Sequence, residues 1–357
     1  MNAKFAKVAS QFTAYQSLQS IVPLGGGLIN DTFLVTGQQR FVLQRLNAHV
    51  FSHPEWVMQN LHALGQHLQT KQPQTVHLQI PSIIPTHDGR LFYLDEAKKV
   101  WRALQLISPA ESRDQLHHVD EAAQIGFALA HFHRLCSDLQ PALLKDTLPG
   151  FHVTPGYFDR YQQLLAEPLQ VVEDAGFRQC KAFIETHQAG IDILERGKQN
   201  GELLEQVIHG DPKLNNFLFL PGSSQVVSLI DLDTVKPGLL HYDIGDCIRA
   251  CCHEKTGNRF NLNLCRIILT HYLQEIGMTF KTADYDYLYS AIWLIPFELG
   301  LRFFNDYLEG NHYFKIDHPR QNLQRAQSQF AFCDSIQRQK SALMDCISHL
   351  RQHPLPV

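Results

Sequence analysis

A dense group of polar residues lies between apolar runs in the segment 207–234, VIHGDPKLNNFLFLPGSSQVVSLIDLDT. The residues in this segment whose side chains could do chemistry are His209, Asp211, Lys213, Asn216 and Asp231. Such side chains are poor strand formers and cost free energy when they are buried without partners. They therefore either hold a turn together or hold a group that is not protein.

The apolar runs on either side of the sequence PGSS predict a β-hairpin with strands at 217–220 and 225–230. A hairpin brings its two open ends together. Asn216 precedes the first strand and Asp231 follows the second, so we expect these two side chains to lie close to each other. The loop 209–213 enters the same end and brings its own polar side chains there.

The residue types at this end are typical of phosphoryl transfer. Oxygens from Asn216 and Asp231 suit Mg²⁺, which takes its remaining ligands from water and phosphate. The carboxylate of Asp211 can accept a hydroxyl proton, and the ammonium of Lys213 can neutralise a phosphoryl group. The spacing His-x-Asp-x4-Asn, starting at His209, also fits the catalytic-loop pattern of phosphoryl-transfer enzymes. A polar hairpin capped by Asx turns is disfavoured because these positions fit one template in order.

Several strands and one helix precede this segment. Residues 20–45 predict three strands rich in Val, Ile, Phe and Thr and separated by glycine-containing turns. Apolar residues at helical spacing predict a helix over Pro54–Gln69. Strand-like runs follow at Ile80–Ile84, at Leu91–Tyr93 and in the sequence KVWRALQLI. From Asp120 onwards helical patterns dominate.

We therefore predict an α+β fold with two lobes. The small β-rich N-terminal lobe covers residues 1–101, and the larger, mainly helical C-terminal lobe covers residues 102–357. The connector between them lies at about 101–107. We expect the nucleotide to bind to the N-terminal lobe, and the catalytic groups and the acceptor to lie in the C-terminal lobe.

Composition excludes several function classes. With a net charge of −4, the protein lacks the overall positive charge that would attract nucleic acid or an anionic membrane. The longest apolar stretch is broken by Pro296, Glu298 and Arg302, so we expect no membrane span. Eight cysteines without a small disulfide scaffold and an N-terminus without a secretion signal favour the cytoplasm. Oligomeric state is not predicted.

The motifs HGDPKLNN and IDLDTVKPGLLHYDIGDCIR, together with the segment Phe297–Gln329, resemble the aminoglycoside phosphotransferase family. The resemblance is strongest to its N-acetylhexosamine 1-kinase branch. It implies a protein-kinase-like fold with ATP in the cleft between the lobes. It also implies an ATP- and Mg²⁺-dependent kinase that phosphorylates the anomeric hydroxyl of an N-acetylhexosamine, an amino sugar, to the sugar 1-phosphate.

The same resemblance assigns roles within the motif. Asp211 would accept the hydroxyl proton, and Lys213 would lie near the γ-phosphate. Asn216 and Asp231 would hold Mg²⁺. Asp233 would be either a second metal ligand or a structural acceptor, and both readings stay open. The YDIGD sequence that follows would brace the catalytic loop.

The nucleotide site is implied by weaker signals. The backbone of Gly25, Gly26 and Gly27 would cover the ATP phosphates, although alone this run equally fits an ordinary hairpin turn. Residues 101–104 would form the connector whose backbone binds adenine. The residues this assigns to the nucleotide are Trp101, Arg102 and Ala103, together with Gln44. Gln44 stands where protein kinases have a lysine on the third strand, and Arg45 beside it would point away.

The acceptor site departs from the sugar-kinase pattern at one position. Asn30, Asp31, Arg302 and Tyr313 would contact the sugar by analogy with the branch. Leu28, however, stands where the branch has a sugar-contacting histidine, and a site that loses a polar partner can change its preference strongly. Two alternatives follow. One is a kinase for another small alcohol, such as an aminoglycoside or a choline- or ethanolamine-like compound, and the other is a nucleotide-binding pseudokinase.

Overall fold

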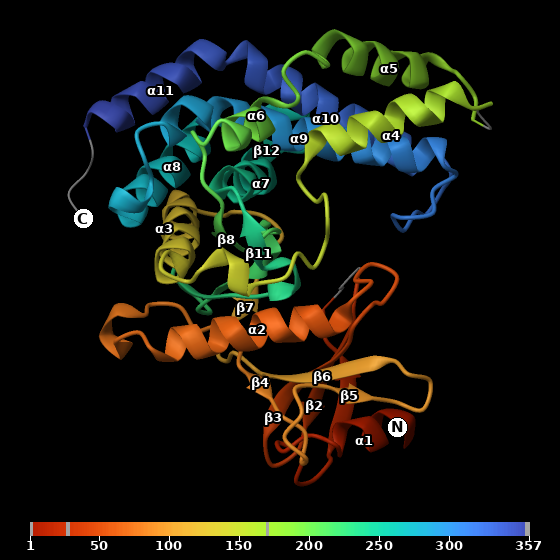
Figure 1. The fold of residues 1–357 in the computed structure, drawn as a ribbon, viewed down its shortest axis with the longest axis vertical. Coiled ribbons are helices and arrows are strands. Elements are labelled where there is room, and N and C mark those ends of the chain that lie inside the picture. Colours follow the sequence, from red (N-terminus) through yellow and green to blue (C-terminus); the bar gives the residue numbers. More distant parts are fainter. Residues whose placement is uncertain (1–2, 26–28, 169–170, 354–357) are drawn as a thin grey trace.

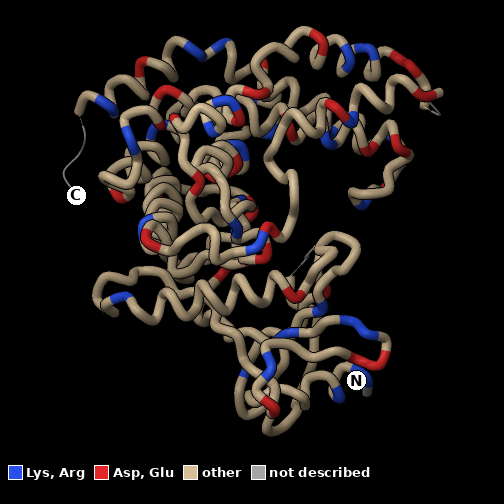
Figure 2. The backbone as a smooth tube through the Cα atoms, viewed as in Figure 1, with Lys and Arg blue, Asp and Glu red and all other residues tan. Residues whose placement is uncertain are grey.

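The chain folds into a β-rich N-terminal lobe and a larger helical lobe, with helix α2 (Pro54–Gln69) lying between them (Figure 1). This computed structural model describes residues 3–25, 29–168 and 171–353. The arrangement is the kinase-like fold predicted from the sequence. Lys and Arg residues are interspersed with Asp and Glu residues along the backbone of both lobes (Figure 2). Within the described ranges, no helix has both the length and the apolar character needed to span a membrane.

The N-terminal lobe is built on one antiparallel sheet with the strand order β1-β2-β3-β6-β4, and β5 also pairs with β6. Its strands are β1 (Ser20–Pro23), β2 (Asp31–Thr36), β3 (Arg40–Arg45), β4 (Ile83–Ile84), β5 (Tyr93–Leu94) and β6 (Val100–Gln105). The three predicted strands in residues 20–45, the later strand-like runs and helix Pro54–Gln69 are confirmed. Helix α1 (Ala3–Ala9), which was not predicted, covers one face of the sheet.

Strand alternation sorts the residues of β3 and β6 onto two faces. Trp101 packs with Leu43 in the apolar cluster beneath α1 and is fully buried. Gln44 pairs in register with Arg102, and these two side chains lie on the opposite face, towards α2 and the helical lobe. Gln44 therefore faces the helical lobe, and its contact with a nucleotide stays a prediction.

The prediction that residues 101–104 form the connector between the lobes is wrong. They lie inside β6, where Arg102 and Ala103 pair with β3. Their backbone groups therefore belong to the sheet ladder, and the chain leaves the sheet only after Gln105. The predicted domain limit at residue 101 falls within this strand.

The helical lobe has a continuous apolar core in which the long helix α9 packs against α4, α7 and α10. Its helices are α3 (Val119–Cys136), α4 (Thr154–Ala166), α5 (Ala175–His187), α6 (Ile193–Gln199), α7 (Leu240–Cys252), α8 (Leu262–Ile276), α9 (Asp284–Leu308), α10 (Gln321–Arg338) and α11 (Lys340–Gln352). Helices α5, α10 and α11 lie at the end remote from the sheet (Figure 1). Short 3₁₀ helices span Pro73–Thr75, Pro141–Leu143, Leu214–Asn216, Leu232–Thr234 and Gly277–Thr279.

The predicted hairpin is present at the edge of the helical lobe that faces the sheet, as β9 (Phe217–Phe219) and β10 (Val226–Leu229). Strand β7 (Glu111–Ser112) adds to β9. Two small antiparallel pairs were not predicted: β8 (Gln206–Ile208) with β11 (Lys236–Gly238), and β12 (His253–Glu254) with β13 (Arg259–Phe260). Pairing of β8 with β11 brings the start and the end of the polar segment to one place.

Candidate active site

The open end of the hairpin brings the predicted catalytic residues together. Strand β8 leads into the loop that holds Asp211, and the 3₁₀ helix η3 (Leu214–Asn216) leads into β9. Strand β10 leads to Asp231 and then to the 3₁₀ helix η4 (Leu232–Thr234). The backbone N–H of Ile230 donates to the carbonyl of Asn216 at 2.9 Å, which ties the two ends of the hairpin.

Asp211 and Lys213 form an ion pair on the catalytic loop. The ammonium group of Lys213 contacts a carboxylate oxygen of Asp211, and both side chains remain partly exposed. Burial alone would lower the pKa of Lys213, but the carboxylates of Asp211 and Asp231 raise it above its usual value. The lysine is therefore charged at neutral pH, and a proton acceptor and a cation face the same part of the cleft.

Asn216 and Asp231 lie where a divalent cation can be held. The carboxamide nitrogen of Asn216 donates to the carbonyl of Asp211 at 2.8 Å, which leaves its oxygen as the group able to bind a metal. Asp231 has left-handed backbone angles (φ 65°, ψ 55°), which aspartate tolerates better than most residues. Although its side chain is open to solvent in the cleft, burial of its surroundings and the nearby carboxylate of Asp233 raise the pKa of Asp231 to about 7.

This donor set fits Mg²⁺. A cation would relieve the charge repulsion that raises the pKa of Asp231, and one amide oxygen with one carboxylate leaves positions for water and phosphate oxygens. Within the part of the chain that the structure describes, no three His, Cys, Asp or Glu side chains form a ready-made metal cluster. A cation at this place would therefore complete its coordination with water and, when nucleotide is bound, with phosphate oxygens.

The side chain of Asp243 holds the catalytic loop in place. Its carboxylate is fully buried and accepts the backbone N–H groups of His209 at 2.7 Å and Gly210 at 2.8 Å. The ring of His133 on α3 lies 2.8 Å from the same carboxylate. His209 itself lies 2.9 Å from the carbonyl of Ile230. These contacts give the HGD and YDIGD motifs the bracing role that the resemblance implied.

Gly210 is required by its position in the loop. Its φ is +86°, and a Cβ atom there would lie 2.6 Å from the carbonyl oxygen of Thr234. The loop that holds the catalytic carboxylate therefore crosses the segment after Asp231 at a distance that only glycine permits.

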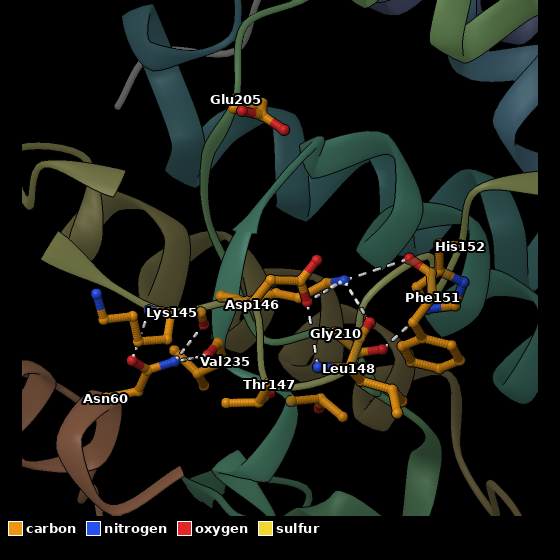
Figure 3. A network of polar contacts seen from close by, with 12 residues as sticks. Asn60, Lys145, Asp146, Thr147, Leu148, Phe151, His152, Glu205, Gly210 and Val235 are labelled. Atoms are coloured by element: carbon orange, nitrogen blue, oxygen red, sulfur yellow. Dashed lines mark hydrogen bonds and ion pairs between the residues drawn. The ribbon is translucent and has the colours of Figure 1, made fainter. Parts of the chain in front are cut away.

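A second polar network supports the same loop (Figure 3). The buried ammonium of Lys236 donates to Asp146 at 2.9 Å and to the carbonyl of Leu148 at 3.0 Å. The ring of His152 lies 2.9 Å from the carbonyl of Gly210. The network thus links the segment that precedes α4 to both halves of the site, and the sequence analysis did not identify it.

Helix α2 also reaches the site through a buried amide. Asn60 donates to the carbonyls of Lys145 at 2.7 Å and Val235 at 2.8 Å (Figure 3). Its position gave a signal that the sequence analysis missed, because it lies on the apolar face of the helix beside Val57 and Leu61. A buried asparagine needs partners, so its presence on that face indicates a polar contact with another segment.

Gly25 and Gln44 are two of the residues predicted to bind the nucleotide. Gly25 has a φ of +71° with open space around it, whereas Gly26, Gly27 and Leu28 lie outside the described residues. The amide of Gln44 donates to Thr32 at 3.0 Å and accepts from Arg102 at 2.9 Å.

Trp101 and Arg102, which were assigned to adenine binding, have other partners. The indole N–H of Trp101 donates to Asp95 at 3.1 Å on the side away from the helical lobe. The guanidinium of Arg102 forms an ion pair with Asp233. With residues 101–103 inside β6, the segment after Gln105 is the part of the chain that links the lobes.

Arg302 lies in an aromatic cage. Its guanidinium carbon is 4.8 Å from the ring centroid of Phe151, 5.3 Å from that of Tyr157 and 5.7 Å from that of Phe314. Burial alone would lower its pKa, but neighbouring groups that include Tyr157, Glu298 and Asp211 raise it. Arg302 is therefore a charged side chain on the same side of the cleft as the catalytic carboxylate.

Tyr313 and Asp31, two other predicted acceptor residues, lie in different lobes. Tyr313 is about half exposed, at 51%, and its loop is held by Asp306, which accepts the backbone N–H of Tyr313 at 2.7 Å. Asp31 lines a cavity of about 310 Å³ together with Lys315 and forms an ion pair with Arg45. The segment after α9 therefore faces the N-terminal lobe across this cavity.

Asn30 is also in the cleft, but protein groups occupy its carboxamide. Its nitrogen donates to Asp233 at 2.7 Å, and its oxygen accepts the backbone N–H of Asn47 at 3.0 Å. In this structure Asn30 joins the lobes and has no group directed at an acceptor.

Comparisons with known proteins agree with this arrangement. Residues 20–273 match the Phosphotransferase enzyme family. A microcompartment-associated aminopropanol kinase has a similar fold, with a TM-score of 0.68, 18% identity and coverage of 96% of this chain and 99% of that one. An aminoglycoside phosphotransferase from Alicyclobacillus acidocaldarius has a TM-score of 0.66 and 16% identity, with coverage of 95% of this chain and 96% of that one. The amicoumacin kinase hAmiN, solved with AMP-PNP, Ca²⁺ and Ami, has a TM-score of 0.56 and 13% identity, with coverage of 93% of each chain.

The matched region covers both the sheet and the catalytic loop, and the chain belongs to the phosphotransferase enzyme family. It is a phosphotransferase with a kinase-like fold. These solved structures are less than 20% identical to this chain, so their similarity establishes the fold and leaves the acceptor to be argued from the site.

Proposed function

We propose that this phosphotransferase uses Mg²⁺ and ATP to phosphorylate the anomeric hydroxyl of an N-acetylhexosamine such as N-acetylglucosamine or N-acetylgalactosamine. The observation that carries the proposal is the meeting of Asp211, Lys213, Asn216 and Asp231 at one edge of the helical lobe. Eight free cysteines fit a reducing cytoplasm as its location.

In the proposed reaction a carboxylate oxygen of Asp211 takes the proton of the acceptor hydroxyl. The hydroxyl oxygen then bonds to the γ-phosphorus while the bond to the β,γ-bridging oxygen breaks, and ADP leaves. Lys213 turns from Asp211 towards the γ-phosphate as the acceptor hydroxyl takes its place. Asn216 and Asp231 would hold Mg²⁺, which when bound supplies positive charge to the phosphates.

The charges around Arg302, which is proposed to contact the acceptor, favour a neutral acceptor. Arg302 occupies the aromatic cage that a cationic acceptor would otherwise use. Each carboxylate nearby already has one basic partner, since Oδ1 of Asp246 accepts from Arg249 at 2.7 Å and Glu298 lies 3.4 Å from His152. The guanidinium of Arg302 instead offers hydrogen-bond donors to the acetamido oxygen or hydroxyl groups of a sugar.

A second candidate is an alcohol that carries an amine. It is favoured by the names of similar proteins, an aminopropanol kinase and an aminoglycoside phosphotransferase. One feature of the site also fits it, because the buried Oδ2 atom of Asp246 has no hydrogen-bond partner among the described residues. That oxygen could accept a bond from an ammonium group.

The choice is tested by product formation with paired acceptors. N-acetylglucosamine is compared with its 1-O-methyl glycoside, in which the anomeric hydroxyl is blocked, and with 1-amino-2-propanol and kanamycin. The proposal predicts phosphate transfer to the free sugar and none to the glycoside. Transfer to both sugars would place the reaction at another hydroxyl, and transfer only to the amines would contradict a neutral acceptor.

A further inference from the structure

Arg102 is a buried cation that crosses from the N-terminal lobe to the helical lobe. It is only 1% exposed, and its Nη2 atom lies 2.5 Å from Oδ1 of Asp233. Its Nε atom donates to Gln44 at 2.9 Å, so the neighbouring strand β3 fixes the direction of the guanidinium. The register of β3 and β6 thus places a cation directly opposite Gln44, which carries no charge.

The side chain of Asp233 is held by residues of the N-terminal lobe. One carboxylate oxygen forms an ion pair with Arg102, and the other accepts from Asn30 at 2.7 Å. The residue is 2% exposed. Both oxygens of this carboxylate therefore face groups of the N-terminal lobe, Oδ1 through an ion pair and Oδ2 through a hydrogen bond.

The same turn carries the proposed metal ligand. Asp231 precedes η4, and Asp233 lies within it, so a contact that fixes one also restrains the other. Thr147 holds the backbone of Asp233 from the opposite side, donating to its carbonyl at 2.8 Å. Arg102 also lies close enough to Asp231 to act on its carboxylate electrostatically.

We propose that Arg102 and Asp233 form a clasp between the lobes that positions Asp231, and that Asp233 is not a metal ligand. This inference rests on the proposed function, because the Asp231 carboxylate is taken to hold Mg²⁺. Asp233 is neutralised by Arg102, so it does not compete with Asp231 for the cation. The clasp also ties the metal-binding turn to the sheet that carries the nucleotide.

The energetics determine which variants are informative. Replacing either residue alone leaves its charged partner buried without a counter-ion, which is strongly destabilising. Replacing both groups with neutral ones of similar size avoids that cost. The double variant Arg102→Met/Asp233→Asn is therefore the main test, and Arg102→Met adds the case in which the Asp233 carboxylate is freed to bind the cation.

The test measures Mn²⁺ binding to the nucleotide-free protein by electron paramagnetic resonance, and kcat at saturating substrates. In Arg102→Met the freed Asp233 carboxylate adds a ligand and a positive charge is lost, so Mn²⁺ affinity rises about five-fold. In the double variant the net charge is unchanged, and Mn²⁺ affinity stays within about two-fold of wild type. Both variants lose about 10–100-fold in kcat because Asp231 is misplaced.

The matched control replaces Arg90 and Asp88, an exposed pair in the same lobe with a separation of 2.7 Å. Arg90→Met/Asp88→Asn should leave both quantities unchanged. A fall of ten-fold or more in Mn²⁺ affinity in the double Arg102/Asp233 variant would show that Asp233 is a ligand. A kcat equal to that of the wild type in the double variant would show that the Arg102–Asp233 pair only balances charge and does not position Asp231. Either result would contradict the proposal. Absence of turnover in the wild type would contradict the proposed function alone, since Mn²⁺ binding still decides the role of Asp233.

Discussion

The ammonium of Lys213 contacts the carboxylate of Asp211, two residues before it on the catalytic loop. The carboxylates of Asp211 and Asp231 raise the pKa of Lys213, which keeps the lysine charged while the cleft holds no substrate. A γ-phosphate would compete for the lysine, and an acceptor hydroxyl would compete for the carboxylate. In the proposed reaction, binding of the two substrates would therefore separate a pair that lies together in the free protein.

Loss of the Asp231 carboxylate should weaken metal use. Asp231→Asn keeps the shape of the side chain but removes its charge. We expect the Mg²⁺ concentration for half-maximal turnover to rise at least about ten-fold, with kcat reduced even at saturation. A titration of Mg²⁺ against turnover measures this, with Asp88→Asn as a surface control. An unchanged Mg²⁺ requirement would remove Asp231 from the metal site.

Removal of Arg302 from the aromatic cage should weaken binding of the acceptor and leave ATP binding intact. Arg302→Met fills the aromatic cage without a charge. The loss of charged hydrogen bonds, about 1.5–3 kcal/mol, should raise the acceptor KM about 10–100-fold. The KM for ATP should change less than about two-fold. A steady-state comparison of the two KM values checks this, and equal effects on both would indicate that Arg302 only supports the fold.

Gly210 should be intolerant of a side chain. In Gly210→Ala, backbone strain at φ +86° adds to the 2.6 Å approach to Thr234. We expect a loss of about 2–4 kcal/mol in the free energy of unfolding, with turnover falling as the loop shifts. Gly89→Ala separates the two causes, because Gly89 has a φ of +80° and nothing within 4 Å of an added Cβ. Equal destabilisation in both variants would mean that close packing at Gly210 is unimportant.

His241 should make the fold sensitive to acid. It is buried and lies 2.8 Å from the carbonyl of Asp284, and burial lowers its pKa from 6.5 to about 4. The unfolded chain therefore binds a proton between pH 6.5 and pH 4 that the folded chain excludes. Stability contributed by neutral His241 is complete above pH 6.5 and falls by about 3 kcal/mol by pH 4.

Denaturant unfolding of wild type and His241→Gln from pH 7.5 to pH 4.5 tests this sensitivity. Glutamine keeps an N–H donor for the carbonyl of Asp284 but does not titrate. The stability of the variant should therefore fall less steeply with acid than that of the wild type. Parallel curves for the two proteins would rule out His241 as a source of the acid sensitivity.

The catalytic loop and its hairpin were predictable because their geometry is local. The PGSS turn fixes which residues meet, so Asn216 and Asp231 were expected together from spacing alone. The helix at about Pro54–Gln69 was likewise predicted from its apolar period. The lobes, each dominated by one type of element, follow from the same patterns.

Contacts between distant segments could not be predicted in this way. Nothing near Arg102 in the sequence indicates its pairing with Asp233, which depends on how the sheet packs against the helical lobe. The connector was misplaced because an alternating strand pattern marks the strand but not the residue at which the chain leaves the sheet. The aromatic cage around Arg302 likewise combines residues from three separate segments.

The most direct test of the central claim is Mg²⁺-dependent ADP release by wild type and Asp211→Asn, with ATP and a panel of N-acetylhexosamines, hexoses and amino alcohols. We predict acceptor-dependent turnover in the wild type and a loss of about 10²–10⁴-fold in the variant, with nucleotide binding retained. Nucleotide binding with no turnover on any acceptor would support a pseudokinase. Undiminished turnover in Asp211→Asn would contradict the role of Asp211 as the proton acceptor, and with it this account of the site.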